Sequence, residues 1–297
     1  MTEEKKTKRN RVAIRQKSQI GSIIRRFSKN KLALSGFIVF SVLVLGAVFA
    51  DFLVDYNADA ITQNVKIRYT RPNGAHIFGT DAFGRDVFAR ILYGARISLS
   101  VGVVTIVTSL FMGAIIGAVS GYYGGRIDNV LMRLMDVFLA IPQTLMAICI
   151  VAALGTGTIK MLIALSIAQV PQFARIVRSS ILMVKGQEFI EAAKACGTGD
   201  ARIIAVHILP NAIGPIIVQA TLNVAHTILS ITMLSFLGIG IQPPTPEWGS
   251  MMSEAKSQMR YYPYLVYIPG IFIGMTTLSL NLIGDGLRDA LDPRLKN

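Results

Sequence analysis

The sequence predicts an all-α integral membrane protein with six transmembrane helices, and three observations support this prediction. Of the 297 residues, 52% are hydrophobic and only 16% are charged, and the mean hydropathy of +0.52 is too high for an ordinary soluble domain. The apolar residues gather in long runs, most of which reach the ~20 residues that a helix needs to cross ~30 Å of hydrocarbon. A dense basic segment stands directly before the first run, as is typical of the cytosolic side of a span.

The positive charge of the chain is concentrated near its N-terminus. The net charge is +13, and 11 of the 30 lysine and arginine residues lie within residues 1–31. The positive-inside rule therefore places this segment in the cytosol, and its position before a span argues against nucleic-acid binding. The segment is too long for a signal peptide, and the next apolar run exceeds the about 7–15 residues of a signal core, so we expect no cleavage.

The end of this basic tail has the pattern of an amphipathic helix. Between residues 18 and 29, apolar side chains recur at helical spacing, and arginine and lysine occupy the opposite side. The apolar side consists of Ile20, Ile23, Ile24 and Phe27. Such a helix lies on the inner leaflet with its basic side toward anionic headgroups. For residues 1–16 we expect a disordered basic tail instead.

Six predicted spans follow along the chain. They run from about Leu32 to Val54, Ile97 to Val119, Leu134 to Leu154, Ile159 to Phe173, Ala212 to Leu237 and Tyr264 to Leu282. The fourth is short and contains Pro171, and we expect its helix to continue past Arg175 and Arg178, whose long side chains can reach the cytosolic surface. An even number of spans returns the C-terminus to the cytosol.

The spans divide the chain into segments with different expected environments. These are a cytosolic tail (1–31), a first transmembrane helix (32–54), an extracytoplasmic segment (55–95), a transmembrane domain (96–285) and a second cytosolic tail (286–297). The transmembrane domain contains a charged cytosolic loop at 186–210. Its second span also carries small residues four apart, which allow another helix to approach closely, from this chain in the favoured interpretation or from a second subunit. These small residues are Thr105, Ser109, Gly113, Gly117 and Gly121.

The cytosolic loop predicts two short helices joined by a glycine bend. Residues 187–196 are good helix formers, and Gly197 and Gly199 interrupt them because glycine frees the backbone to turn. Asp200 is placed to cap a second helix, and Pro210 precedes the fifth span. Such a compact protrusion fits a groove on a partner protein, and a simple interfacial hairpin is the alternative.

The same loop resembles the coupling loop of permease subunits in ATP-binding-cassette (ABC) importers. That family has the pattern E-A-A, three residues, G, nine residues, I, one residue, L-P. The sequence matches it at Glu191, Ala192, Ala193, Gly197, Leu209 and Pro210, and has His207 where the family has isoleucine. The resemblance implies that these seven residues form an ATPase-coupling site, inserted into a cleft on a cytosolic ATPase. The histidine puts one packing contact of that site in doubt.

Two further segments resemble the C-type permease subunits of dipeptide, oligopeptide and nickel importers. One is FGTDAFGRDVFAR at 78–90, followed by GARISL at 94–99, and the other is LGIGIQPPTPEWG at 237–249. The resemblance covers about residues 20–295. In the first segment we expect an i,i+4 pair between Asp86 and Arg90 on a short helix outside the membrane.

The second segment contains a proline-rich run that cannot be helical, so it is expected to cap the fifth span externally. Four aromatic residues at or after this run are expected to form an interfacial aromatic belt rather than a ligand site. They are Trp248, Tyr261, Tyr262 and Tyr264.

Polar residues also recur along the fifth span, at steps of four, three and four. They are Gln219, Asn223, His226 and Ser230. Polar side chains within a span face the protein interior or water, so this set is expected either to form interhelical hydrogen bonds or to line a translocation path. A single histidine cannot build a nickel site, so we expect no metal site.

The resemblance implies the MetI-like fold of type I ABC importers and the import of di- or oligopeptides, with nickel import as the alternative. It implies a homologous B-type permease, two ABC ATPases that bind ATP and Mg²⁺, and an extracytoplasmic peptide-binding protein as partners, in a bacterial or archaeal cell (inner) membrane. The chain has no G-x-x-x-x-G-K-[ST] sequence, so ATP hydrolysis is expected on another polypeptide and no cofactor on this one.

Two other classes of function have weaker support. An ion-coupled secondary transporter needs ionisable groups deep within its spans and often has inverted repeats, whereas Asp136 and Asp285 lie near span ends. A membrane enzyme needs a catalytic cluster, whereas His76, His207 and His226 are scattered along the chain.

Overall fold

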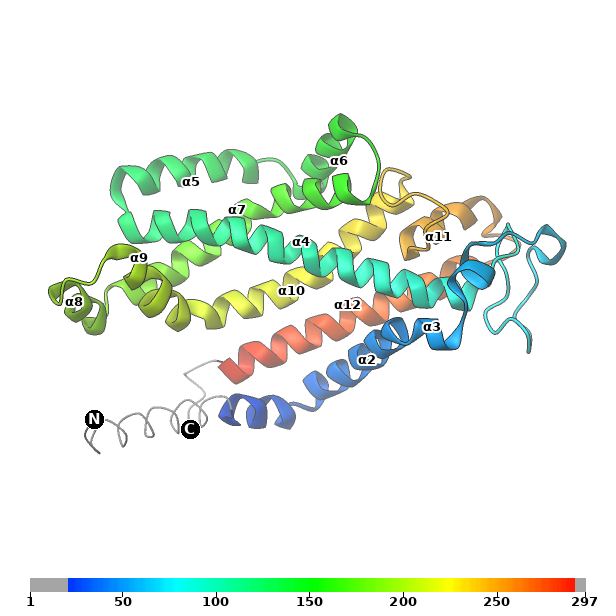
Figure 1. The fold of residues 1–297 in the computed structure, drawn as a ribbon, viewed down its shortest axis with the longest axis horizontal. Helices are drawn as coiled ribbons and strands as arrows, with labels where there is room; N and C mark the ends of the chain where they lie inside the picture. Colours follow the sequence, from blue (N-terminus) through cyan, green and yellow to red (C-terminus); the bar gives the residue numbers. More distant parts are fainter. Residues whose placement is uncertain (1–20, 292–297) are drawn as a thin grey trace.

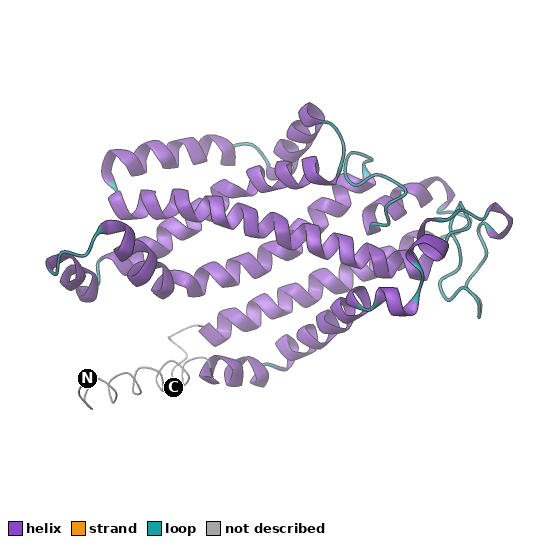
Figure 2. Cartoon of the chain, in the orientation of Figure 1, coloured by secondary structure: helices purple, strands orange, loops and turns teal. Residues whose placement is uncertain are grey.

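The computed structural model describes residues 21–291, which form an elongated bundle of long helices (Figures 1 and 2). Within these residues there is no β-strand, only an isolated bridge between Thr80 and Asp86, and the predicted all-α fold is confirmed. Five of the described helices are long and apolar enough to cross a membrane, or up to six if one bent pair forms a single span. We call the end that carries α8 and α9 the loop end, and the end that carries α11 the cap end.

The five long helices are α2 (Lys31–Val48), α4 (Val87–Tyr123), α7 (Thr158–Lys185), α10 (Leu209–Phe236) and α12 (Tyr264–Leu291). Short helices connect or cover them. These are residues 21–29, α3 (Ala50–Leu53), α5 (Gly125–Leu139), α6 (Gln143–Leu154), α8 (Glu188–Ala195), α9 (Asp200–Arg202) and α11 (Trp248–Ala255). The fourth predicted span does continue past Arg175 and Arg178 to the end of α7.

The centre of the bundle is the pair α4 and α7, which run side by side toward the loop end (Figure 1). Their contact depends on the small residues of α4. A Cβ atom on Gly113 would lie 2.6 Å from Phe173 Cβ, and one on Gly117 would lie 2.4 Å from the carbonyl oxygen of Ala174. Only glycine permits this approach, so the predicted close packing is confirmed as a contact within the chain.

The prediction of a separate external helix before the second span was wrong. Helix α4 is continuous from Val87, and Asp86 caps it by accepting a hydrogen bond from the Ala89 amide at 2.9 Å. The other carboxylate oxygen of Asp86 lies 2.7 Å from His76 Nδ1, so Asp86 does not pair with Arg90. Arg90 is turned inward instead and is buried, because the half-buried carboxylates of Asp81 and Glu254 lie beside its guanidinium group.

The third predicted span is also not continuous. Helices α5 and α6 meet at an angle of 84°, and Pro142 directly precedes α6. A proline disfavours the helical conformation of the residue before it, here Ile141, and helices therefore end at such positions. Helix α5 also begins earlier than predicted, at Gly125, and lies alongside α7.

The predicted amphipathic helix is helical over residues 21–29, and its residues 18–20 lie outside the described part. Phe27 packs edge-on against Phe37 with ring centroids 6.3 Å apart, and it lies beside Gly286 of α12. Ile24 is exposed. The short helix therefore packs against the bundle through Phe27, whereas the side chain of Ile24 points away from the bundle. The predicted tail 1–16 and the end of the second tail, 292–297, lie outside the described residues.

Candidate functional site

The glycine bend of the loop has the geometry that the sequence predicts. Helix α8 ends with hydrogen bonds from the Gly197 amide to the Lys194 carbonyl (2.9 Å) and from the Thr198 amide to the Ala193 carbonyl (3.1 Å). This is a Schellman motif, which places the residue after the cap in the left-handed region. Gly197 accordingly has φ +74°, and a Cβ atom there would meet nothing within 4 Å. The constraint at this position is therefore conformational rather than steric.

Apolar anchors fix the loop to the transmembrane helices. Ile190 of α8 and two residues of the following π-helical turn (Ile203–Ile208), Ile203 and Ile208 themselves, are fully buried. They belong to one cluster whose other members come from α4, α7 and α10. These members include Tyr122, Val177, Ile181, Val184, Ala212 and Ile216. Because a buried branched side chain contributes about 1.5–3 kcal/mol, the loop behaves as part of the bundle rather than as a free hairpin.

Polar contacts around Tyr122 add to this anchoring. The Tyr122 hydroxyl donates to Asp200 Oδ1 at 2.6 Å, and the ammonium groups of Lys194 and Lys185 lie 5.2 and 5.8 Å from the tyrosine ring centroid. Asp200 therefore does not cap the second helix as predicted. It is the first residue of α9, and Gly199 stands at the cap position, because the Tyr122 hydroxyl binds the aspartate carboxylate.

The seven predicted coupling residues fall into two groups in the structure. Ala193, His207 and Leu209 are half-buried on the side of the loop that faces the bundle. The other four, Glu191, Ala192, Gly197 and Pro210, are exposed. The Glu191 carboxylate makes no ion pair with any residue between 21 and 291. The loop thus presents a free negative charge on a rigid support, which is an arrangement suited to binding a partner.

The members of the polar set of α10 lie in different environments. Asn223 is buried, and its Nδ2 finds no hydrogen-bond acceptor among the described residues. His226 is exposed, and the half-buried Ser230 donates to its carbonyl at 3.0 Å. The interhelical hydrogen bond is made instead by Thr227, whose Oγ1 lies 3.0 Å from Nε2 of Gln169 on α7. The presence of a glutamine within an apolar span is the sequence signal for this contact, which was not among the predicted ones.

Gln219 lines a cavity of about 610 Å³ at the loop end, between α7, α10 and α12. Its lining combines apolar side chains such as Leu222 with polar ones, among them Gln187, Asn211 and Arg288. Pro215 stands inside α10 and lacks an amide hydrogen, so the Asn211 carbonyl loses its helical donor there. The cavity therefore combines a mostly apolar lining with a few polar groups.

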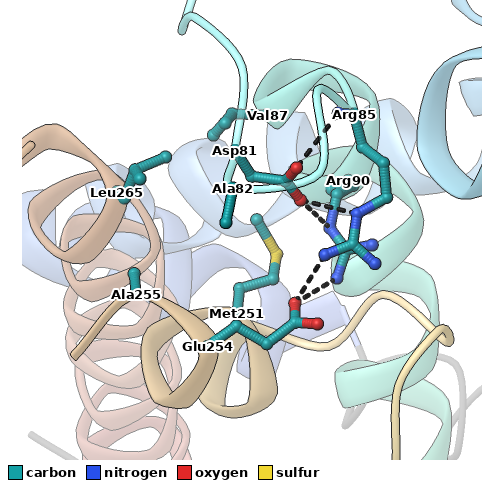
Figure 3. A pocket seen from close by; sticks show the side chains of 9 residues that line it. All are labelled: Asp81, Ala82, Arg85, Val87, Arg90, Met251, Glu254, Ala255 and Leu265. Atoms are coloured by element: carbon teal, nitrogen blue, oxygen red, sulfur yellow. Dashed lines mark hydrogen bonds and ion pairs between the residues drawn. The ribbon is translucent and has the colours of Figure 1, made fainter. Parts of the chain in front are cut away.

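At the cap end, buried charges hold three segments together (Figure 3). Arg85 and Arg90 are only 2% and 1% exposed, and both lie between Asp81 and Glu254 of α11. The guanidinium nitrogens of Arg85 lie 2.6 Å from Asp81 Oδ2 and 2.8 Å from Glu254 Oε2, and Arg90 Nη2 lies 3.0 Å from Glu254 Oε2. Arg90 also donates to the Ala60 carbonyl at 3.1 Å. The sequence motif at 78–90 is thus a structural clamp, which we call the cap cluster (Asp81, Arg85, Arg90, Glu254).

The neighbouring aromatic residues do not form the predicted belt. Trp248 is completely buried, and its Nε1 donates to the Ile91 carbonyl at 3.2 Å. Tyr262 stacks on Tyr69 with centroids 4.3 Å apart, and the Tyr264 hydroxyl donates to the Thr80 carbonyl at 2.9 Å. Of the four predicted belt residues only Tyr261 is exposed, because Trp248 packs against α4 and the 55–86 segment contacts Tyr262 and Tyr264. Burial also raises the pKa of Glu247, which caps α11 by accepting from the amides of Gly249 and Ser250.

The comparisons with known proteins agree with this architecture. Residues 109–297 match the family described as "Binding-protein-dependent transport system inner membrane component", and residues 18–72 match "N-terminal TM domain of oligopeptide transport permease C". The chain is 46% identical over 273 residues to the dipeptide transport system permease protein DppC of Alkalihalophilus pseudofirmus, covering 92% of this chain and 89% of that one. It is 42% identical over 272 residues to the glutathione transport system permease protein GsiD of Escherichia coli, with the same coverage.

Among solved structures, an inward-facing conformation of the MetNI methionine ABC transporter has a similar fold. The TM-score is 0.55 at 17% sequence identity, and the match covers 68% of this chain and 96% of the other. This likeness concerns the fold alone, and it confirms the predicted MetI-like arrangement. The chain therefore belongs to the binding-protein-dependent transport system inner membrane component family, as a multi-pass, C-type ABC importer permease.

Proposed function

We propose that this permease imports di- or oligopeptides, with ATP hydrolysis on partner subunits as the energy source. The support for a peptide substrate is that the relatives reported above are named for dipeptide and glutathione transport, which favours peptides over nickel. The chain itself has no phosphate-binding sequence, so two ABC ATPases would bind the ATP and Mg²⁺. A homologous B-type permease and an extracytoplasmic peptide-binding protein complete the proposed assembly in a bacterial or archaeal inner membrane.

The observation that carries this proposal is the loop at 186–210. Its outer side offers the exposed Glu191, which has no ion-pair partner in the described part of the chain, and its inner side is buried through Ile190, Ile203 and Ile208 against three long helices. A movement of α8 imposed by an ATPase would therefore displace α4, α7 and α10 together, because packed interfaces transmit a shift rather than absorb it. Alternating access of the membrane path would follow from that displacement. The chain would act as a transmission element without any covalent chemistry of its own.

The test is reconstitution of the complete transporter in proteoliposomes. We expect ATP hydrolysis and peptide uptake only when the ATPases and both permeases are present, and neither activity from the purified chain. Unlabelled peptide should reduce the uptake of labelled peptide, and Ni²⁺ should not. ATP hydrolysis by this chain alone would contradict its assignment as a transport subunit without an ATPase site. Uptake of nickel without uptake of peptide would favour the alternative function, nickel import.

We further propose that the loop end is cytosolic and the cap end extracytoplasmic, as the basic N-terminal segment predicts. Cys149 and Cys196 are exposed and must first be replaced by serine. In that background, Ser257→Cys at the exposed cap end should be labelled only from outside, and Ala205→Cys in the exposed part of the loop only from the cytosol. Labelling of both positions from the same side would refute the proposed topology.

We also propose that Gln219, His226 and Ser230 line the path, whereas Asn223 contributes mainly to packing. Cysteine at Gln219, beside the 610 Å³ cavity, should react with a water-soluble thiol reagent in the nucleotide-free transporter. Its reaction rate should change by about tenfold or more in the ATP-trapped state, because alternating access closes one side of the path. Ile228→Cys is the matched control, since Ile228 is fully buried in the same helix.

For Asn223→Leu we expect no loss of stability and a gain of up to about 1 kcal/mol, because the buried Nδ2 of Asn223 has no acceptor among the described residues and leucine leaves no polar group unsatisfied there. Equal protection of Gln219, His226 and Ser230 in both nucleotide states would leave α10 with a structural role only.

A further inference from the structure

A charged depression lies between α5 and α7, away from the loop at 186–210 and from the proposed path along α10. It has a volume of about 500 Å³ and a lining dominated by polar side chains. The lining residues are Asp128, Asn129, Met132, Arg133 and Asp136 of α5 with Arg175 and Arg178 of α7. We call this depression the α5–α7 groove. Five of its seven lining residues are ionisable, so its charge balance determines what it can bind.

The carboxylates of the groove do not neutralise its arginines. Asp128 is fully used, since Arg178 binds it through Nε and Nη2 at 2.5 Å each and the Ser120 hydroxyl donates to it as well. Asp136 is bound by a single nitrogen of Arg175, also at 2.5 Å. Arg133 makes no ion pair or hydrogen bond with a described residue. Within residues 21–291 the guanidinium of Arg133 is thus left without a partner, and Arg175 has further N–H donors. Together they are a suitable donor set for a phosphate group.

The outer surface beside the groove is apolar. Ile127, Val130, Leu134 and Val137 follow one another at steps of three, four and three along α5, and each is between 47% and 68% exposed. The charged side of α5 therefore faces α7, and its apolar side faces outward. This is the reverse of the pattern of a soluble surface helix, and it suits contact with hydrocarbon chains.

The level of the groove corresponds to the end of the hydrocarbon layer. The backbone at Arg178 lies against Gly117 of α4, which is two residues before the end of the predicted second span at Val119. Basic pockets between transmembrane helices at this depth bind lipid headgroups. We propose that the α5–α7 groove binds the headgroup phosphate of an anionic phospholipid through Arg133 and Arg175, while its acyl chains cover the apolar side of α5. The inner leaflet as the source of this lipid rests on the proposed orientation.

The test uses the complete transporter in phosphatidylcholine nanodiscs with and without phosphatidylglycerol, followed by native mass spectrometry and thermal unfolding. In the mass spectra, the Arg133→Gln transporter should retain one phosphatidylglycerol molecule fewer than the wild type. Its affinity for phosphatidylglycerol at the groove should be about fivefold lower, the factor that corresponds to ~1 kcal/mol for one basic residue. The stabilisation of the wild type by phosphatidylglycerol should shrink in the same variant. Arg126→Gln is the matched control, because Arg126 is exposed on the same helix but does not line the groove.

Each alternative gives a different result. Equal lipid loss in Arg126→Gln would indicate general surface attraction and overturn the proposal. Stabilisation of the wild type by free inorganic phosphate as strong as that by phosphatidylglycerol would mean that the groove is a site for a soluble anion. A cysteine introduced by Val130→Cys can also be cross-linked to cysteines introduced in the companion permease. Efficient disulfide formation between the two subunits would show that protein covers this side of α5 and would also overturn the proposal. Unchanged lipid retention in Arg133→Gln would remove the site.

Discussion

Replacing Glu254 by glutamine should destabilise the permease by about 3 kcal/mol, since removal of one partner leaves a buried charge uncompensated. Glu254 Oε2 is shared by Arg85 and Arg90 at 2.8 and 3.0 Å, and both arginines are almost inaccessible to water. Asp81 would remain as their only carboxylate in the cap cluster, with the longer distance of 3.7 Å to Arg90. The measurement is the unfolding midpoint in detergent, monitored by the exposure of the buried Trp248.

A matched control separates this effect from simple loss of a carboxylate. Glu188→Gln removes a charge from an exposed position of α8 and should change the stability by less than about 0.5 kcal/mol, as surface substitutions do. A double change of Glu254→Leu and Arg90→Met should recover part of the loss, because an apolar pair replaces a buried ion pair at little cost. If Glu254→Gln were as stable as Glu188→Gln, the cap cluster would not be a clamp.

Substitution of Gly197 by leucine should abolish uptake while the permease still folds and inserts. A side chain at φ +74° is strained by roughly 1–2 kcal/mol, and the chain can relieve this strain by opening the Schellman bend. No atom lies within 4 Å of the new Cβ, so the bundle itself has no steric reason to unfold. Peptide uptake and co-purification of the ATPase subunits are the two measurements, and both should be lost.

The neighbouring glycine provides the control for this experiment. Gly199 has φ −66° and also no neighbour within 4 Å, so Gly199→Ala should transport normally whereas Gly197→Ala should be impaired. Glu191→Lys reverses the free charge on the exposed side of the same loop and should abolish uptake without loss of stability. Normal transport by both Glu191→Lys and Gly197→Leu, with ATPase bound, would contradict the assignment of the coupling loop.

The features predicted correctly from the sequence depend on local chemistry. Small residues four apart in α4 identify a close helix contact whatever the partner, and the structure supplies α7 as that partner. Gly197 ends a run of helix formers, and glycine after such a run predicts a left-handed bend. Both inferences depend only on the residues of one helix or its end, and neither requires the partner segment to be known.

The errors concern contacts between distant segments. Trp248 follows a span end, where interfacial aromatic residues are common, yet it is completely buried between α4 and Phe272 of α12, and hydropathy gives no sign of this. Arg90 has an acidic residue one turn earlier, but Glu254 is its stronger partner from 164 positions away. The set on α10 shares an angular sector, and the packing of neighbouring helices decides that Asn223 is buried and His226 is not. The spacing of residues along a helix predicts the direction in which each side chain points, but it does not predict which neighbouring segment packs against that side chain.

The length of α4 has a mechanical consequence for the molecule. Its 37 residues extend for about 55 Å at 1.5 Å per residue, well beyond the thickness of a hydrocarbon layer. It joins Arg90 in the cap cluster to Tyr122 under the loop, and it has no internal proline, unlike α7, α10 and α12, which contain Pro171, Pro215 and Pro269. A stiff rod of this length turns a tilt of about 5° at one end into a displacement of about 5 Å at the other. The two faces of the membrane are thus joined by one lever arm, and the proline-bearing helices beside it are the ones able to flex.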